Sequence, residues 1–166
     1  QHGLLKGAAQ MDGWKDSVSS QGGPEDQSAY RSELGGLYAI AAMVQVICEL
    51  HNIQEGSIEV ACDGMNALAQ VGETDPIIWP NRAQYDIIAA TQAKIKRTNI
   101  QWKMRHVMGH QDDTQGCTVM DRWETLNCMM DERAKQHWQH HSTRTTRVQE
   151  AVDGEPWAVW RGSSKI

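Results

Sequence analysis

The most regular hydrophobic pattern in the chain lies between residues 29 and 50. Apolar residues recur there at alternating steps of three and four: Leu34, Leu37, Ala41, Val44 and Cys48. This spacing places apolar side chains on one face of an α-helix. Ser28 stands just before the pattern and is a residue type that caps helix N-termini. The sequence therefore predicts a helix from about Ala29 to Leu50.

The rest of the chain alternates between shorter strand-like and helix-like patterns. The ranges that read as strands are 1–14 (weakly), 58–62 and 100–107. The ranges that read as further helices are 64–71, 83–97 and 119–140. Polar stretches at 15–28, 72–81 and 108–116 are expected to be loops. This order predicts an α/β fold with helices packed on the faces of a sheet.

The chain of 166 residues is long enough for one domain with a full core. We expect this domain to span residues 1–141. Residues 142–166 are polar until PWAVW at 156–160, which resembles the start of a strand. They are expected to be a linker or the start of a following region. The first residue is Gln rather than Met, so the start is expected to be a truncation or processing point.

The net charge of the chain limits its possible functions. A net charge of −5 argues against a generic basic nucleic-acid coat, but not against an enzyme whose site is a carboxylate cluster. The most basic stretch, residues 94–105, could contact phosphates or be a solvated charged face.

The cysteines and the hydropathy pattern indicate an intracellular protein. Cys48, Cys62, Cys117 and Cys128 show no CxxC spacing, and the first two lie in apolar stretches typical of buried thiols. A reducing compartment, cytoplasm or nucleus, is therefore expected. No apolar run reaches the roughly 18 residues of a membrane span, and no signal segment opens the chain.

Glu33 is an unusual acid because it continues an apolar stripe. Steps of three and four from it reach Leu37, Ile40 and Val44. A buried carboxylate is costly unless it has a partner or a metal ion. The alternative is that the stripe has ended and Glu33 lies in solvent near the helix N-terminus, where negative charge is favoured.

Asp63 directly follows a predicted strand, and His110 lies in the loop just beyond another. Ligands collect at the C-terminal edge of the strands in open α/β sheets, so Asp63 is a candidate site residue. Its alternative is a simple Asp-Gly turn or an N-cap. His110 lies in a polar loop, where a histidine suits proton transfer near neutral pH.

Asp131 is the third acid of interest. It shares a face of the last predicted helix with Asn127 and borders the apolar side. The alternative is a solvated acid paired with the nearby Arg133 or Lys135.

Four segments together resemble the type 1 ribonuclease H family, in the version attached to reverse transcriptases of retrotransposons and retroviruses. They are SAYRSELGGLYAI, IEVACDGMNAL, HVMGHQDD and LNCMMDERAK. The resemblance covers roughly residues 3 to 141 and places Glu33, Asp63, His110 and Asp131 at the family's catalytic positions. It implies a mixed sheet flanked by helices.

One departure from the family pattern concerns its first catalytic aspartate, which lies on an opening strand. Asp12 is the only upstream Asp-Gly, and it lies too close to Glu33 for the intervening strands. The resemblance therefore implies that the first strand and its aspartate precede this sequence. A sheet without them exposes an edge, so we expect the isolated chain to be poorly soluble.

The resemblance implies endonucleolytic hydrolysis of the RNA strand of RNA–DNA hybrids with two Mg²⁺ ions, or Mn²⁺. Glu33, Asp63 and Asp131 would hold the metal, and His110 would assist proton transfer or product release. The residues implied in substrate binding are Gly35, Gly36, Asn66 and Asn127. Gly35 and Gly36 could equally serve tight helix-on-sheet packing. The expected partners are the hybrid and a fused reverse transcriptase, with no membrane.

Three alternatives remain open from the sequence. The first is a non-catalytic module of the same fold, which a missing aspartate would favour. The second is an integrase or transposase core, which also uses acids for phosphoryl transfer; Asn127 and His110 favour ribonuclease H over it. The third is a zinc module built from His106, His110, Cys117 and Cys128, whose spacing fits zinc poorly.

Overall fold

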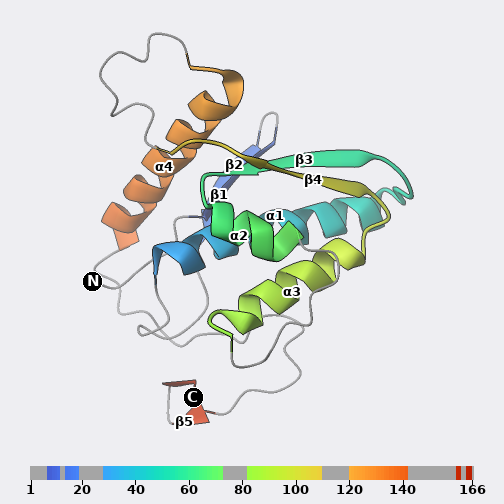
Figure 1. The fold of residues 1–166 in the computed structure, drawn as a ribbon, viewed down its shortest axis with the longest axis horizontal. Coiled ribbons are helices and arrows are strands. Elements are labelled where there is room, and N and C mark those ends of the chain that lie inside the picture. Colours follow the sequence, from blue (N-terminus) through green and yellow to red (C-terminus); the bar gives the residue numbers. More distant parts are fainter. Residues whose placement is uncertain are drawn as a thin grey trace.

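A computed structural model of the chain describes residues 7–11, 14–18, 28–72, 82–109, 120–141, 160–161 and 164–165. The strands in this part of the chain are β1 (Gly7–Met11), β2 (Trp14–Val18), β3 (Ser57–Cys62), β4 (Gln101–His106), β5 (Trp160–Arg161) and β6 (Ser164–Lys165). The helices are α1 (Ala29–Leu50), α2 (Met65–Gly72), α3 (Tyr85–Lys96) and α4 (Arg122–His141). Figure 1 shows their arrangement.

The described strands form three two-stranded sheets. β1 and β2 pair antiparallel, and so do β5 and β6. β3 and β4 pair parallel, in a register that runs from Ser57 opposite Gln101 to Cys62 opposite His106. A parallel pair needs a long crossover, and here α2 and α3 supply it. The α/β class predicted from the sequence is confirmed.

The core lies between the β3–β4 pair and helices α1, α2 and α3, which cover one side of it (Figure 1). Its fully or nearly fully buried members are Leu34, Leu37, Val60, Ala67, Leu68, Val71, Ile87 and Ile88. α1 is long and apolar enough to cross a membrane by length and composition alone. One face of α1 packs in this core, and about a third of its apolar window is buried.

The predicted bounds of α1 are confirmed. Ser28 caps it, since its Oγ accepts a hydrogen bond of 3.1 Å from the Arg31 backbone N–H. The predicted loop at 15–28 is wrong in part, because Trp14–Val18 forms β2. WKDSV carries little strand signal of its own, and its pairing with β1 decides its structure. Trp160, expected near a strand start, lies in β5.

Candidate functional site

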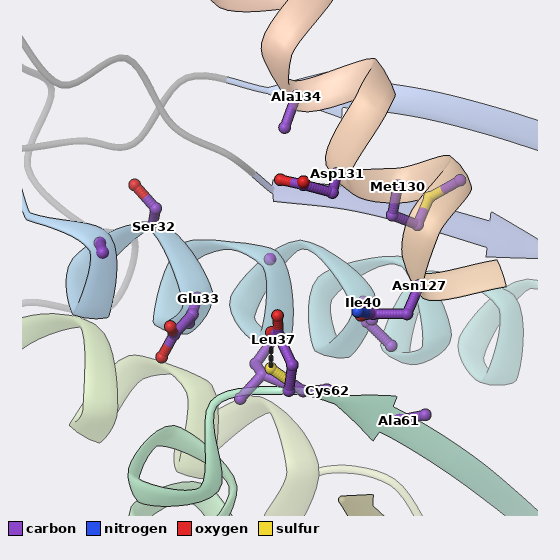
Figure 2. A pocket seen from close by; sticks show the side chains of 13 residues that line it. Ser32, Glu33, Leu37, Ile40, Ala61, Cys62, Asn127, Met130, Asp131 and Ala134 are labelled. Atoms are coloured by element: carbon purple, nitrogen blue, oxygen red, sulfur yellow. Dashed lines mark hydrogen bonds between the residues drawn. The ribbon is translucent and has the colours of Figure 1, made fainter. Parts of the chain in front are cut away.

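A cavity of about 200 Å³ lies where α1, the C-terminal end of β3 and α4 meet. Its polar lining includes Glu33, Asp63, Asn127 and Asp131. Figure 2 shows Glu33 on α1, Cys62 at the end of β3, and Asn127 and Asp131 on α4 around this space. The three acids predicted from the sequence thus reach one pocket from three elements. His110 lies outside the described residues.

Glu33 lies against the residue that follows Asp63. A Cβ atom added to Gly64 would overlap Oε2 of Glu33, so the carboxylate packs directly against the residue that follows Asp63. Burial raises the pKa of Glu33, and the negative charge of Asp63 raises that pKa further. Glu33 is partly buried and partly in contact with solvent, whereas Asp63 is exposed at the rim.

Asp63 is held by the residues at the end of β4. Its carbonyl oxygen lies 3.1 Å from Nε2 of His106 and accepts a second hydrogen bond, also 3.1 Å, from the Met65 backbone N–H. A Cβ atom added to Gly109 would lie 2.8 Å from Asp63 Oδ2. Our sequence reasoning missed these roles of His106, Gly64 and Gly109. The only available signal was that both glycines adjoin predicted site residues.

Asp131 lies on α4, one turn after Asn127. Its side chain is 24% exposed, and Oδ2 is 2.9 Å from Nζ of Lys135. The pairing with Lys135 that the sequence offered as an alternative is therefore present. Asp131 nevertheless lines the pocket, so the ion pair and a role in the site are compatible.

Cys62 lies inside the pocket beside the acids. Its Sγ accepts a hydrogen bond of 3.3 Å from the Gly64 backbone N–H. Burial raises the pKa of the Cys62 thiol to about 11, so it stays protonated near neutral pH. The protonated thiol lies 3.9 Å from Oδ1 of Asp63, to which it can donate a weak hydrogen bond. Cys62 is half-buried and Cys48 is buried, and both are free thiols.

The residues expected to contact substrate fall into different environments. Gly36 and Asn127 line the pocket, and Asn66 is exposed on α2. Gly35 is buried, which favours the packing explanation for it.

The basic stretch at 94–105 does not form one free charged face. Lys94 is buried, with its ammonium 5.3 Å from the centre of the Tyr38 ring. Arg105 pairs with Glu59 at 2.7 Å and lies 5.3 Å from the centre of the Trp123 ring. Both cations are therefore engaged within the domain.

The donor set suits a hard divalent cation. Magnesium is commonly bound by one or two carboxylates, with waters and substrate phosphates completing its shell, and Glu33 and Asp63 fit that description. Within the described residues, however, no group of three or more His, Cys, Asp or Glu side chains could hold a metal ion. For the zinc alternative, His106 bonds Asp63, while His110 and Cys117 lie outside the described residues.

Comparisons with known proteins identify no relative. No protein-family model matches the chain. No curated protein and no solved structure matches it significantly.

Proposed function

We propose that this chain is a ribonuclease H-type domain that hydrolyses the RNA strand of RNA–DNA hybrids, as part of a retroelement polyprotein. One observation carries the proposal. Glu33, Asp63 and Asp131, which come from segments far apart in the sequence, line one pocket at the C-terminal end of a parallel strand. Asn127 lines it too, one turn before Asp131, as in the motif that suggested the family.

The chemistry follows from the acids. Bound divalent ions would activate water and stabilise charge on the leaving oxygen of the phosphodiester. Glu33 and Asp63 would hold the ions, and a bound cation would offset both the burial and the nearby charge of Asp63, which raise the pKa of Glu33. Asp131 would complete the ligand set from α4. His110 keeps the proton-transfer role that the resemblance implies.

The proposal includes a ribonuclease H-like fold completed by one more strand. Among the described residues, β3 pairs only with β4. Two cavities lie between β3 and α1, the acidic one at its C-terminal end and one of about 260 Å³ near its N-terminal end, lined by Val44, Ile47 and Ile58. The resemblance implies that a further strand beside β3 would bring the family's first catalytic aspartate to this site.

Cleavage of a labelled RNA–DNA hybrid with Mg²⁺ tests this function. The chain would be compared with a version extended upstream by about 40 residues, enough for a strand and its connections. Asp63→Asn and, as a matched control, Glu49→Gln on the far end of α1 would be made in both. We expect cleavage in the extended chain, unchanged in Glu49→Gln and lost in Asp63→Asn.

A non-catalytic module of the same fold is the second candidate. The absence of a three-ligand group among the described residues favours it. Cleavage by neither version of the chain would decide for this module. Strand transfer on DNA alone would instead indicate an integrase-like core.

A further inference from the structure

We infer that His106 is a positioning residue for Asp63. The contact between the two residues is independent of the proposed function, whereas its effect on metal binding rests on that function. His106 is the last residue of β4, and the parallel register sets it opposite Cys62, next to Asp63. Its Nε2 lies 3.1 Å from the carbonyl oxygen of Asp63. A carbonyl oxygen only accepts hydrogen bonds, so the ring nitrogen must donate.

The charge state of the His106 ring does not decide this contact. Nε2 carries a proton in the imidazolium and also in one neutral tautomer. The acceptor selects that tautomer, so the hydrogen bond to Asp63 persists in both states.

Both peptide groups that flank the Asp63 Cα are bonded to the end of β4. The preceding carbonyl, of Cys62, accepts a hydrogen bond of 3.1 Å from the Val107 backbone N–H. The following carbonyl, of Asp63 itself, accepts from His106. Fixing both peptide planes fixes the two backbone dihedrals of Asp63, and with them the direction of its Cβ. Residues 106 and 107 therefore aim this side chain.

Gly109 completes the support by leaving room for the carboxylate. A Cβ atom there would lie 2.8 Å from Oδ2 and 3.4 Å from Cβ of Asp63. The first of these contacts is with the end of a short side chain, which can rotate away. An added methyl group would thus turn the carboxylate without requiring the backbone to move.

His106 is exposed, which allows its role to be separated from folding. Replacing it leaves no cavity in the core, and the Val107 backbone bond remains. The pertinent variants are His106→Ala, which removes the donor, and His106→Gln, whose amide can donate from a similar reach. His51→Ala is a matched control, because His51 is another exposed histidine, at the end of α1.

The experiment combines nuclear magnetic resonance of the whole chain with a Mg²⁺ titration. In His106→Ala we expect a changed Asp63 carboxyl ¹³C shift, faster hydrogen exchange at the Met65 amide, and about tenfold weaker Mg²⁺ binding, as when a group that orients a metal ligand is removed. His106→Gln should largely restore all three. His51→Ala should match the wild type, and all urea midpoints should stay close.

This design distinguishes failure of the positioning role from failure of the proposed function. An unchanged carboxyl shift and unchanged exchange in His106→Ala would overturn the positioning role, whatever the metal does. Absence of Mg²⁺ binding in the wild type would count against the proposed function. The shift and the exchange rate would then still show whether His106 holds Asp63.

Discussion

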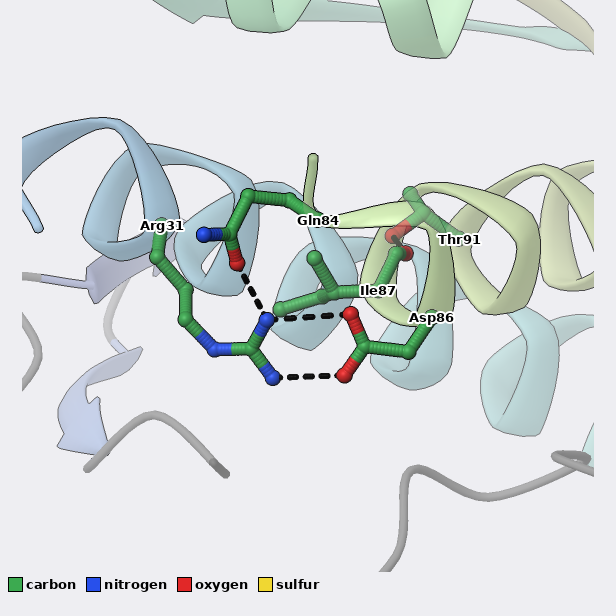
Figure 3. A network of polar contacts seen from close by, with 5 residues as sticks. All are labelled: Arg31, Gln84, Asp86, Ile87 and Thr91. Atoms are coloured by element: carbon green, nitrogen blue, oxygen red, sulfur yellow. Dashed lines mark hydrogen bonds and ion pairs between the residues drawn. The ribbon is translucent and has the colours of Figure 1, made fainter. Parts of the chain in front are cut away.

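Arg31 and Glu33 lie two residues apart in the first turns of α1, yet their surroundings are opposite. Arg31 is 1% exposed, and its guanidinium meets both carboxylate oxygens of Asp86, at 3.0 and 2.7 Å, and also Gln84 (Figure 3). Glu33 is half-buried and faces Asp63, a charge of its own sign. The positive charge of Arg31 is therefore paired with an opposite charge, whereas the negative charge of Glu33 lies near a like charge.

The difference separates a structural ion pair from a candidate site. The Arg31–Asp86 pair ties the start of α1, where Glu33 also lies, to the start of α3. Acids held close together are costly for the fold and suit binding of a cation. The predictions that follow alter first the ion pair and then the acidic site.

The largest effect is expected from Asp86→Ala. This change leaves a buried guanidinium without its bidentate partner, which costs about 3 kcal/mol of unfolding free energy. Urea denaturation measures it. The double variant Arg31→Met/Asp86→Ala should recover more than about 1 kcal/mol, because the buried charge is gone. A loss below about 1 kcal/mol in Asp86→Ala would show that the pair is not structural.

Gly64→Ala should affect the site more than the fold. The new methyl group would displace the end of the Glu33 side chain, so we expect Mg²⁺ affinity to fall about tenfold. Unfolding free energy should change by no more than about 1 kcal/mol, since no core atom moves. Gly72→Ala is the control, because among the described residues its Cβ would meet Met104, which packs against the core. Equal Mg²⁺ affinity in Gly64→Ala and wild type would contradict the assignment.

Glu33→Gln should stabilise the fold near neutral pH. The pKa of Glu33 is raised in the folded state, so its ionisation opposes folding once pH exceeds the unfolded pKa, and fully so above the folded one. At pH 7 the variant should gain up to about 1 kcal/mol, because partial exposure reduces both the cost of burying the charge and its repulsion from Asp63. The gain should vanish as pH falls below the unfolded pKa of about 4. Urea denaturation across this range would reject the account if the variant were less stable at pH 7.

The smallest effect is expected from Lys135→Met. Its ion pair with Asp131 is an i, i+4 pair between partly exposed side chains, worth about 0.3–0.5 kcal/mol. Thermal denaturation should show a small loss that shrinks at high salt. A loss above about 1 kcal/mol would mean that Asp131 is held more tightly than its exposure indicates.

The sequence predicted those features of the fold that depend on interactions between residues near one another in the chain. The bounds and cap of α1 follow from helical periodicity and from Ser28, both readable in the sequence. β2 could not be predicted, because it depends on pairing with β1. The convergence of Glu33, Asp63 and Asp131 was suggested by motif resemblance. The contacts of His106 with Asp63 arise from the parallel β3–β4 register, which no local pattern encodes.

Calorimetric titration with Mg²⁺ tests the central claim, that Glu33 and Asp63 form a cation site, most directly. Wild type would be compared with Glu33→Gln, Asp63→Asn and the control Glu49→Gln, an exposed acid on the same helix. We predict binding in wild type and Glu49→Gln, and at least about tenfold weaker binding in the other two. Equal Mg²⁺ affinity in all four proteins, or none in any, would contradict the claim.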